Sequence, residues 1–383
     1  MNVPAWQIGR ALGIPIRIHA SWFLVFVFVT WSLATGYLPE ALPGLSESRY
    51  WGMGAVAALL LFLSVVLHEL GHSYVAQHYR IPIGQITLFL FGGVAQMKKE
   101  PPSPKAEFLI AIAGPVVSFA LGACCLGAAV VAESLLVPSG GKGLVVLGGL
   151  LGIVNVQLGL FNLIPGFPLD GGRALRAGLW AWGHNFHRAT SQAALIGLGF
   201  GVVLAGLGAV LLVGAISGTL DHSTASQGGW LIFIGAFLFG AAWSMRRQAA
   251  LRLALSATAV RDVMIRALVT IAPHLAIQTA VDEFFVAHGD GGFPVMDEGQ
   301  IVGLITVEDV RAVPQGLWSW RTVRDVMRVA SPELFIPSDW SIMQAMERMV
   351  QTGWDRLVVV DQGQPVGLIT RSAVAQFLQL HKA

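Results

Sequence analysis

Residues 60–72 read Leu-Leu-Phe-Leu-Ser-Val-Val-Leu-His-Glu-Leu-Gly-His. This apolar run leads directly into a short polar pattern that has the spacing of a zinc site. On a helix, His68 and His72 lie four residues apart and share one face, where two imidazoles can bind one zinc ion. Glu69 then lies beside the metal, within reach of a proton of the water that zinc activates. Two solvated histidines at a helix end remain the alternative, but ionisable residues in a membrane helix are rare and usually functional.

The composition indicates a membrane protein. Hydrophobic residues make up 55% of the chain and charged residues only 12%, against about 25% charged residues in soluble domains. The net charge of +2 and the absence of a long basic run argue against a nucleic-acid partner. Cys124 and Cys125 are adjacent within an apolar segment. Neighbouring cysteines rarely reach disulfide geometry, so we interpret them as packing residues.

Six apolar stretches are long enough to cross a bilayer, which needs roughly 17–25 residues. They cover residues 21–37, 51–76, 108–132, 143–163, 193–216 and 229–245. Basic residues precede the first stretch and follow the second, fourth and sixth, whereas the alternate loops hold only Arg49 and Lys142. The positive-inside rule therefore predicts a multi-pass protein of the cell membrane with both termini cytoplasmic. His68 and His72 then lie toward the cytoplasmic end of the second span.

Three segments near the membrane do not have the pattern of a spanning helix. Residues 14–19 and part of 81–97 alternate apolar and other side chains, which is typical of strands. We expect short strands at the membrane surface, with an irregular interfacial loop as the alternative. Residues 173–188 contain two tryptophans and several cations, a composition that favours an exposed interfacial loop.

A third metal ligand is needed, because catalytic zinc usually takes three protein ligands and one water. The candidate is Asp170, in the segment Asn-Leu-Ile-Pro-Gly-Phe-Pro-Leu-Asp-Gly-Gly at 162–172. The predicted topology places it on the same side of the membrane as the two histidines. The prolines break the helix, and the two glycines permit a close backbone approach. A helix cap in an exposed loop is the alternative role for Asp170.

The chain changes character after residue 245. Residues 246–257 form a basic linker, and a soluble α/β region with an internal repeat follows. Val-Arg-Asp-Val-Met at 260–264 recurs at 323–327, and Val-Gly-Leu-Ile-Thr at 302–306 recurs at 366–370. Two copies about sixty residues apart indicate a duplicated module that pairs with itself. We assign the copies to 258–316 and 317–383.

The two membrane motifs resemble the signatures of the site-2 protease family of intramembrane zinc metalloproteases. The resemblance implies His68, His72 and Asp170 as zinc ligands, Glu69 as general base, and Asn162 as a substrate-binding residue. The family's third-span Gly-Pro-x-x-Asn element reads Gly-Pro-Val-Val-Ser at 114–118. Ser118 thus replaces asparagine, and we assign that element no role. The strand-like segment at 81–97 resembles the family's membrane-associated sheet, which can receive an unwound substrate by strand addition.

The repeats resemble a tandem pair of CBS domains, a family that binds adenine nucleotides such as ATP, ADP or AMP. The family's nucleotide pattern ends in Gly, two apolar residues, Thr or Ser, two further residues and Asp. Residues 303–309 match it fully, which implies Thr306 and Asp309 as nucleotide-binding residues. The second copy has Ala373 at the acidic position, so we expect one competent site. A scaffolding or homodimerisation module is the alternative.

We therefore expect about six transmembrane helices with short membrane-associated strands, followed by a soluble α/β CBS pair. The residue ranges are 1–245 for the protease domain, 246–257 for the linker, and the two copies thereafter. The expected activity is hydrolysis of a peptide bond in or next to a transmembrane segment, modulated by nucleotide. By analogy with the family, the substrate is a single-span protein such as an anti-sigma factor, a membrane-tethered transcription factor or a remnant signal peptide. The rival functions are a CBS-regulated transporter or channel, which would be expected to duplicate its spans, and a catalytically inactive scaffold.

Overall fold

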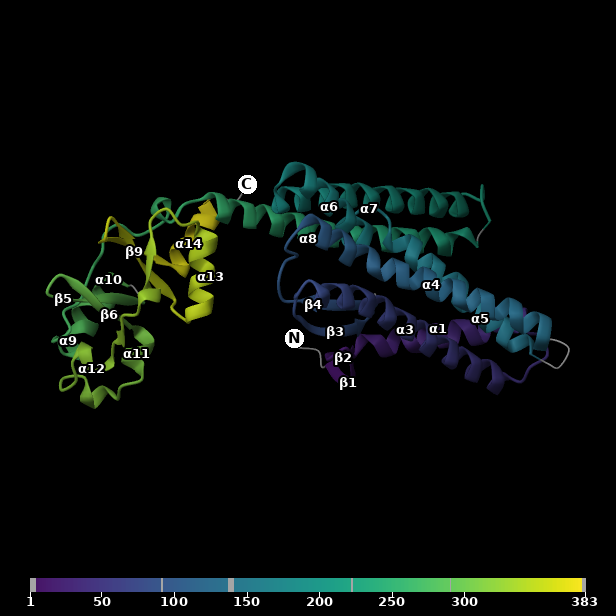
Figure 1. Ribbon diagram of the computed structural model, residues 1–383, viewed down its shortest axis with the longest axis horizontal. Coiled ribbons are helices and arrows are strands. Elements are labelled where there is room, and N and C mark those ends of the chain that lie inside the picture. The colour runs from purple at the N-terminus through teal and green to yellow at the C-terminus, as the bar shows by residue number, and fades with distance from the viewer. Residues whose placement is uncertain (1–4, 91, 137–140, 222, 290, 381–383) are drawn as a thin grey trace. The chain divides into compact units, whose positions relative to one another are not determined.

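The protein consists of two compact units, residues 1–250 and residues 251–383. The computed structural model describes residues 5–90, 92–136, 141–221, 223–289 and 291–380. The first unit contains long helices and one small sheet, and the second contains two small sheets with short helices (Figure 1).

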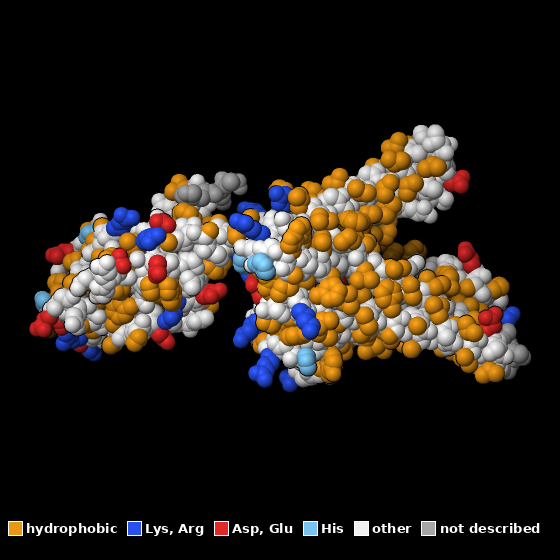
Figure 2. Space-filling model, turned by 45° about the horizontal axis from the view of Figure 1, so that its top comes forward, with side chains coloured by type: hydrophobic (Ala, Val, Ile, Leu, Met, Phe, Trp, Pro, Cys, Tyr) orange, Lys and Arg blue, Asp and Glu red, His pale blue; other side chains and the backbone are white. Residues whose placement is uncertain are grey.

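Among the described residues, six helical segments are long and apolar enough to cross a membrane. These segments are α1–α2 (Ser21–Ser32 and Leu38–Ala41, joined by the π-turn Leu33–Tyr37), α3 (Glu47–His78), α4 (Pro104–Leu136), α5 (Lys142–Asn162), α7 (Phe186–Ile216) and α8 (Thr224–Ala257). Each overlaps one predicted span, so the prediction of six spans is confirmed. Large apolar side chains such as Leu24, Val130 and Val210 stay exposed on the outer faces of these helices. Figure 2 shows such side chains covering the flanks of this unit, as a bilayer requires.

A four-stranded sheet lies against the helices of the first unit. Its strands are β1 (Ala5–Ala11), β2 (Ile14–His19), β3 (Ile83–Phe89) and β4 (Gly92–Met97), in that spatial order. The predicted strands at 14–19 and within 81–97 are confirmed, whereas the sequence did not predict β1. Ile16, Ile18 and Leu88 pack with Trp22 and Val66, which ties the sheet to α1 and α3. Because β4 ends the spatial order, one of its sides is an edge of the sheet.

The expectation of an exposed loop at 173–188 is wrong for most of that segment. Helix α6 runs from Asp170 to Gly183, and α7 begins at Phe186. Trp182 is indeed 85% exposed, but Arg176 is only 9% exposed. The reason is that two of the cations pair with a buried carboxylate, which composition alone does not reveal.

Helices α7 and α8 approach each other through glycines. A Cβ added at Gly201 would lie 2.8 Å from the carbonyl oxygen of Gly235, and one at Gly208 would lie 2.5 Å from that of Gly228. In the other direction, a Cβ added at Gly228 would lie 2.7 Å from the carbonyl oxygen of Gly208, and one at Gly235 would lie 2.6 Å from that of Gly201. The two backbones therefore touch directly at two levels of the hairpin.

The second unit contains two three-stranded sheets that follow the repeat in the sequence. One consists of β5 (Gly292–Asp297), β6 (Gln300–Thr306) and β7 (Arg328–Val329), and the other of β8 (Phe335–Pro337), β9 (Arg356–Asp361) and β10 (Gln364–Thr370). The helices are α9 (Ile277–Ala280), α10 (Val286–His288), α11 (Val307–Arg311), α12 (Val323–Val326), α13 (Ile342–Thr352) and α14 (Arg371–Leu380). Both hairpin turns have positive φ at their central residues, 47° and 79° in the first copy and 49° and 80° in the second, as two-residue type I′ turns require. The α/β repeat predicted from the sequence is thus confirmed.

The predicted linker at 246–257 is helical, because α8 continues through Ala257. The carboxyl-terminal part of this helix belongs to the second unit. There Leu255 is buried in the same core as Val260 and Leu357.

Candidate metal centre

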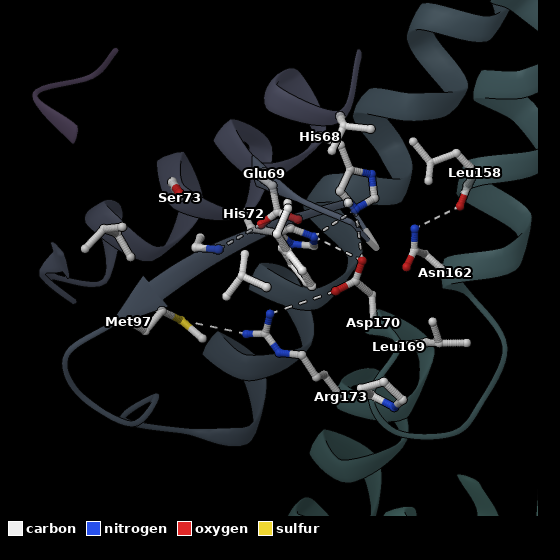
Figure 3. Close-up of a pocket in the computed structure, with 18 of the residues that line it drawn as sticks. His68, Glu69, His72, Ser73, Met97, Leu158, Asn162, Leu169, Asp170 and Arg173 are labelled. Carbon is white, nitrogen blue, oxygen red and sulfur yellow. Dashed lines mark hydrogen bonds and ion pairs between the residues drawn. The ribbon is translucent and has the colours of Figure 1, made fainter. Parts of the chain in front are cut away.

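Two imidazoles and one carboxylate converge at the heart of the first unit. His68 and His72 project from one face of α3, and their Nε2 atoms lie 3.2 Å apart. Oδ2 of Asp170, the first residue of α6, lies 3.1 Å from Nε2 of His68 and 3.0 Å from Nε2 of His72. All three side chains are buried or nearly so, and they point toward one another (Figure 3). The structure thus brings together three residues that lie up to 102 positions apart in the chain.

The donor set and its spacing fit a zinc ion. In tetrahedral zinc sites with ligand distances of about 2.0–2.1 Å, neighbouring ligand atoms lie roughly 3.3 Å apart. The three sides of the triangle here measure 3.0–3.2 Å. Two imidazoles and one carboxylate are the ligands of several catalytic zinc sites, which leave a fourth position open. Electron pairs of three atoms so close together repel one another unless a cation or a shared proton lies between them.

Helix α4 leaves space beside the imidazoles. A Cβ added at Gly114 would lie 2.6 Å from Nε2 of His68 and closer still to Nε2 of His72. Gly71 contributes to this close packing, because a Cβ there would lie 2.9 Å from the carbonyl oxygen of Ala113 on α4. Glycine at both positions lets the two helices enclose the site without filling it.

The outer nitrogen of each imidazole is fixed by α4. Nδ1 of His72 donates a hydrogen bond of 2.6 Å to the carbonyl oxygen of Ile110. Nδ1 of His68 is hydrogen-bonded over 2.8 Å to the hydroxyl of Ser118, which is fully buried. The carbonyl oxygen can only accept, so His72 carries its proton on Nδ1 and leaves Nε2 free for a metal. The Ser118 hydroxyl can accept the corresponding proton from Nδ1 of His68. Ser118 thus has a place in the metal centre that the sequence did not reveal, and it belongs to the same Gly-Pro-x-x-Ser element as Gly114.

The loop before α6 determines where Asp170 lies. A Cβ added at Gly171 would overlap the carbonyl oxygens of Leu163 and Ile164, and one at Gly172 would overlap the backbone of Gly166. The first turn of α6 therefore packs on the chain that leaves α5, with no room for a side chain between them. This packing brings the carboxylate of Asp170 to the imidazoles.

Glu69 lies in the cavity that contains the metal-ligand triangle. The cavity measures about 320 Å³ and is lined by residues of α3, β3, β4, α5 and α6, and by Phe237 of α8. Oε2 of Glu69 accepts a hydrogen bond of 3.2 Å from the backbone N–H of Ala95 on β4. A Cβ at Gly93 would lie 2.6 Å from Cγ of Glu69, so glycine lets the strand approach the carboxylate.

Asn162, the last residue of α5, lines the same cavity. Its side-chain Nδ2 donates to the carbonyl oxygen of Leu158, one turn earlier, over 3.0 Å (Figure 3). The amide oxygen takes no part in this bond and is available to another donor.

The candidate nucleotide residues lie in the second unit. Thr306 caps α11 together with Asp309: the Thr306 hydroxyl donates to Oδ2 of Asp309 over 2.7 Å, and the backbone N–H of Thr306 donates to the same atom over 2.8 Å. In the second copy, the backbone N–H of Ala373 donates to the hydroxyl of Thr370 over 3.1 Å. The two predicted residues are thus adjacent and hydrogen-bonded to each other.

Comparison with known proteins gives two families. The profile of peptidase family M50 matches residues 56–140 and 137–206, and the CBS domain profile matches 260–316 and 323–380. The chain is 34% identical over 381 residues to the putative zinc metalloprotease sll0528 of Synechocystis sp., covering 98% of this chain and 96% of that protein. It is 32% identical over 374 residues to the zinc metalloprotease MJ0392 of Methanocaldococcus jannaschii, covering 98% and 96%.

Among solved structures, the site-2 protease from Methanocaldococcus jannaschii aligns with a TM-score of 0.43 at 34% identity, covering 64% of this chain and 96% of that one. The whole-length similarity to the two metalloproteases establishes the relationship. The chain therefore belongs to peptidase family M50, the site-2 proteases, and is a multi-pass membrane zinc metalloprotease with a carboxyl-terminal pair of CBS domains.

Proposed function

We propose that His68, His72 and Asp170 hold the zinc ion of this protease and that Glu69 is its general base. The observation that carries the proposal is the triangle of three ligand atoms within 3.2 Å of one another, in the cavity that Glu69 lines. When bound, a zinc ion there supplies Lewis acidity and a nucleophile at neutral pH. The Glu69 carboxylate takes the proton of the attacking water and delivers it to the leaving amine.

We propose a single-span membrane protein as substrate, cut in or next to its transmembrane segment. An anti-sigma factor, a membrane-tethered transcription factor and a remnant signal peptide are candidates by analogy with the family. A helical substrate must unwind first, because its scissile carbonyl is hydrogen-bonded within the helix. The position of β4 supports strand addition as the way to hold the unwound segment, since this edge strand lines the catalytic cavity. Asn162 then binds the substrate backbone through its amide.

The variant Glu69→Gln tests the catalytic assignment. The substituted amide keeps the size of the side chain but cannot accept the proton, so cleavage of a co-expressed single-span substrate should fall by about 10²- to 10⁴-fold. Zinc content, measured by elemental analysis, should stay that of the wild type, whereas Asp170→Ala should lower it. Cleavage by Glu69→Gln at the wild-type rate would remove Glu69 from the mechanism. The same inactive variant can trap the substrate for identification by co-purification.

We propose that an adenine nucleotide binds the first CBS copy at Thr306 and Asp309 and modulates the protease. The continuity of α8 supports such modulation: Phe237 on this helix lines the catalytic cavity, and Leu255 on the same helix packs in the core of the second unit. In the full-length protein, Asp309→Ala should weaken binding of ATP, ADP or AMP in an equilibrium-binding assay. Ala373→Asp, which restores the acidic position of the second copy, is the matched gain-of-binding variant. A wild-type chain that binds none of the three nucleotides would overturn this proposal.

We further propose that both termini and the CBS pair are cytoplasmic, and that the pair forms homodimers. The distribution of basic residues supports this topology, and Figure 2 shows most Lys and Arg side chains of the first unit gathered at one end. Reporter fusions at each terminus test the topology, and the mass of the detergent-solubilised protein tests the dimer. A transporter, a channel or an inactive scaffold would leave the intact metal-ligand triangle without a purpose.

A further inference from the structure

A buried carboxylate outside the sequence motifs lies behind the metal centre. Glu107, near the start of α4, is fully buried. Its Oε1 accepts a hydrogen bond of 3.3 Å from Nε of Arg173 and also pairs with Nη2 of Arg176. Burial of an ionised carboxylate costs free energy unless the carboxylate is paired. Because a buried ion pair contributes little net stability, a role beyond stability is the more informative reading of this one.

Arg173 connects this carboxylate to Asp170. Its Nη1 lies 3.9 Å from Oδ1 of Asp170, one turn earlier on α6, and its Nη2 contacts Sδ of Met97 over 3.8 Å. Figure 3 shows the guanidinium pointing from below toward the Asp170 side chain. The planar guanidinium thus spans two carboxylates, one on α4 and one in the metal-ligand triangle.

The two oxygens of Asp170 have different partners. Oδ2 faces the Nε2 atoms of both histidines, and Oδ1 faces Arg173. Because the guanidinium occupies the Oδ1 side, only Oδ2 is directed at the metal position. Arg173 therefore lies where its charge can orient the Asp170 carboxylate, and Glu107 lies where it can hold Arg173 in place.

Arg176 supplies a second positive charge, so that the two arginines Arg173 and Arg176 balance the two carboxylates Glu107 and Asp170. Its guanidinium stacks on the rings of Phe167 and Phe186, at 5.1 and 4.5 Å from their centroids, and supplies a second positive charge beside Glu107. Glu107 is therefore compensated by Arg176 even when Arg173 is drawn toward Asp170. This leaves Arg173 available to act on the metal ligand rather than only to neutralise Glu107.

We propose that Glu107 is a positioning residue of the zinc site: it holds Arg173, which fixes Asp170 as a ligand through one oxygen. The inference rests on the proposed role of Asp170 as a zinc ligand. Carboxylate ligands whose outer oxygen is held by a second group bind metal more tightly, and loss of that support costs about 10- to 100-fold in affinity. A purely structural role, in which Glu107 only ties α4 to α6, predicts no change at the metal.

The test measures the metal itself in the full-length protein. Zinc affinity, by competition with a chelator, and the visible absorption bands of the Co²⁺-substituted protein should be compared for the wild type, Glu107→Gln and Arg173→Gln. Both variants should lose about 10- to 100-fold in zinc affinity and should shift the Co²⁺ bands. Arg173→Gln keeps the Glu107–Arg176 pair and so covers the case in which Glu107→Gln fails to fold. Glu133→Gln, an exposed position on the same helix, is the matched control and should change neither readout.

The double variant shows whether Glu107 acts through Arg173. If it does, Glu107→Gln with Arg173→Gln should bind zinc no more weakly than Arg173→Gln alone. Additive losses, or single variants with wild-type affinity and Co²⁺ bands, would overturn the inference while leaving the proposed function intact. A wild-type chain that binds neither Zn²⁺ nor Co²⁺ would overturn both.

Discussion

Replacement of Gly114 by alanine perturbs the metal centre at the point where α4 faces the two imidazoles. The added Cβ would lie 2.6 Å from Nε2 of His68 and closer to Nε2 of His72. Since an ordinary non-bonded contact is about 3.5 Å, the methyl group and the rings must separate by about 0.9 Å or more. Distances in a zinc site vary by only about 0.2 Å. Zinc affinity should therefore fall by at least about 100-fold, or about 2.8 kcal/mol.

The assay is zinc binding to the purified full-length protein in detergent, in competition with a chelator of known affinity. Gly127→Ala is the control, because a Cβ at that position of the same helix would meet nothing within 4 Å. It should bind zinc as the wild type does, and thermal unfolding of the metal-free proteins reports any loss of packing. Wild-type zinc affinity in Gly114→Ala would refute the reasoning, since the ligand atoms could not then be the two Nε2 atoms.

Three further predictions concern the same centre. Ser118→Ala removes the hydrogen bond to Nδ1 of His68 and should weaken zinc binding by about 10- to 100-fold, and a Co²⁺ spectrum identical to that of the wild type would contradict this. Gly171→Ala forces a methyl group against the carbonyl oxygen of Leu163 and should destabilise the protein by about 1–3 kcal/mol, as seen in thermal unfolding, whereas Gly178→Ala on the open side of α6 should not. Removal of zinc by a chelator should abolish cleavage of a single-span substrate, and added Zn²⁺ should restore it; activity that survives complete removal would exclude a zinc mechanism.

The sequence predicts those features that depend on short stretches of neighbouring residues or on the distribution of charged residues. The spans follow from apolar length, the strands from alternation of side chains, and the duplication from direct repetition of short segments. The i, i+4 spacing places His68 and His72 on one face of a helix, and the distribution of basic residues predicts Asp170 on the same side of the membrane. The structure brings these three side chains together.

The features that the sequence did not reveal depend on contacts across long separations. Glu107 directly precedes the predicted span at 108–132 and resembles a surface charge in the sequence. Its partner Arg173 lies 66 positions away, and the carboxylate is fully buried. The same pairing explains why the composition of 173–183 misleads toward an exposed loop. In the sequence, Ser118 is only a departure from a family pattern. The structure shows that its hydroxyl is hydrogen-bonded to Nδ1 of His68 over 2.8 Å. Strand β1 contains too few alternating apolar residues to stand out without its partner β2.

The glycine contacts between α7 and α8 determine which substitutions this hairpin tolerates. At positions 201, 208, 228 and 235, backbone meets backbone, so even alanine at one of them drives the helices apart. A Cβ added at Gly199, Gly206, Gly229 or Gly240 on the same two helices would meet nothing within 4 Å. We therefore expect substitutions to be tolerated at positions 199, 206, 229 and 240 but not at positions 201, 208, 228 and 235. Because each of these four positions meets backbone atoms, no substitution on the neighbouring helix can make room for an added side chain.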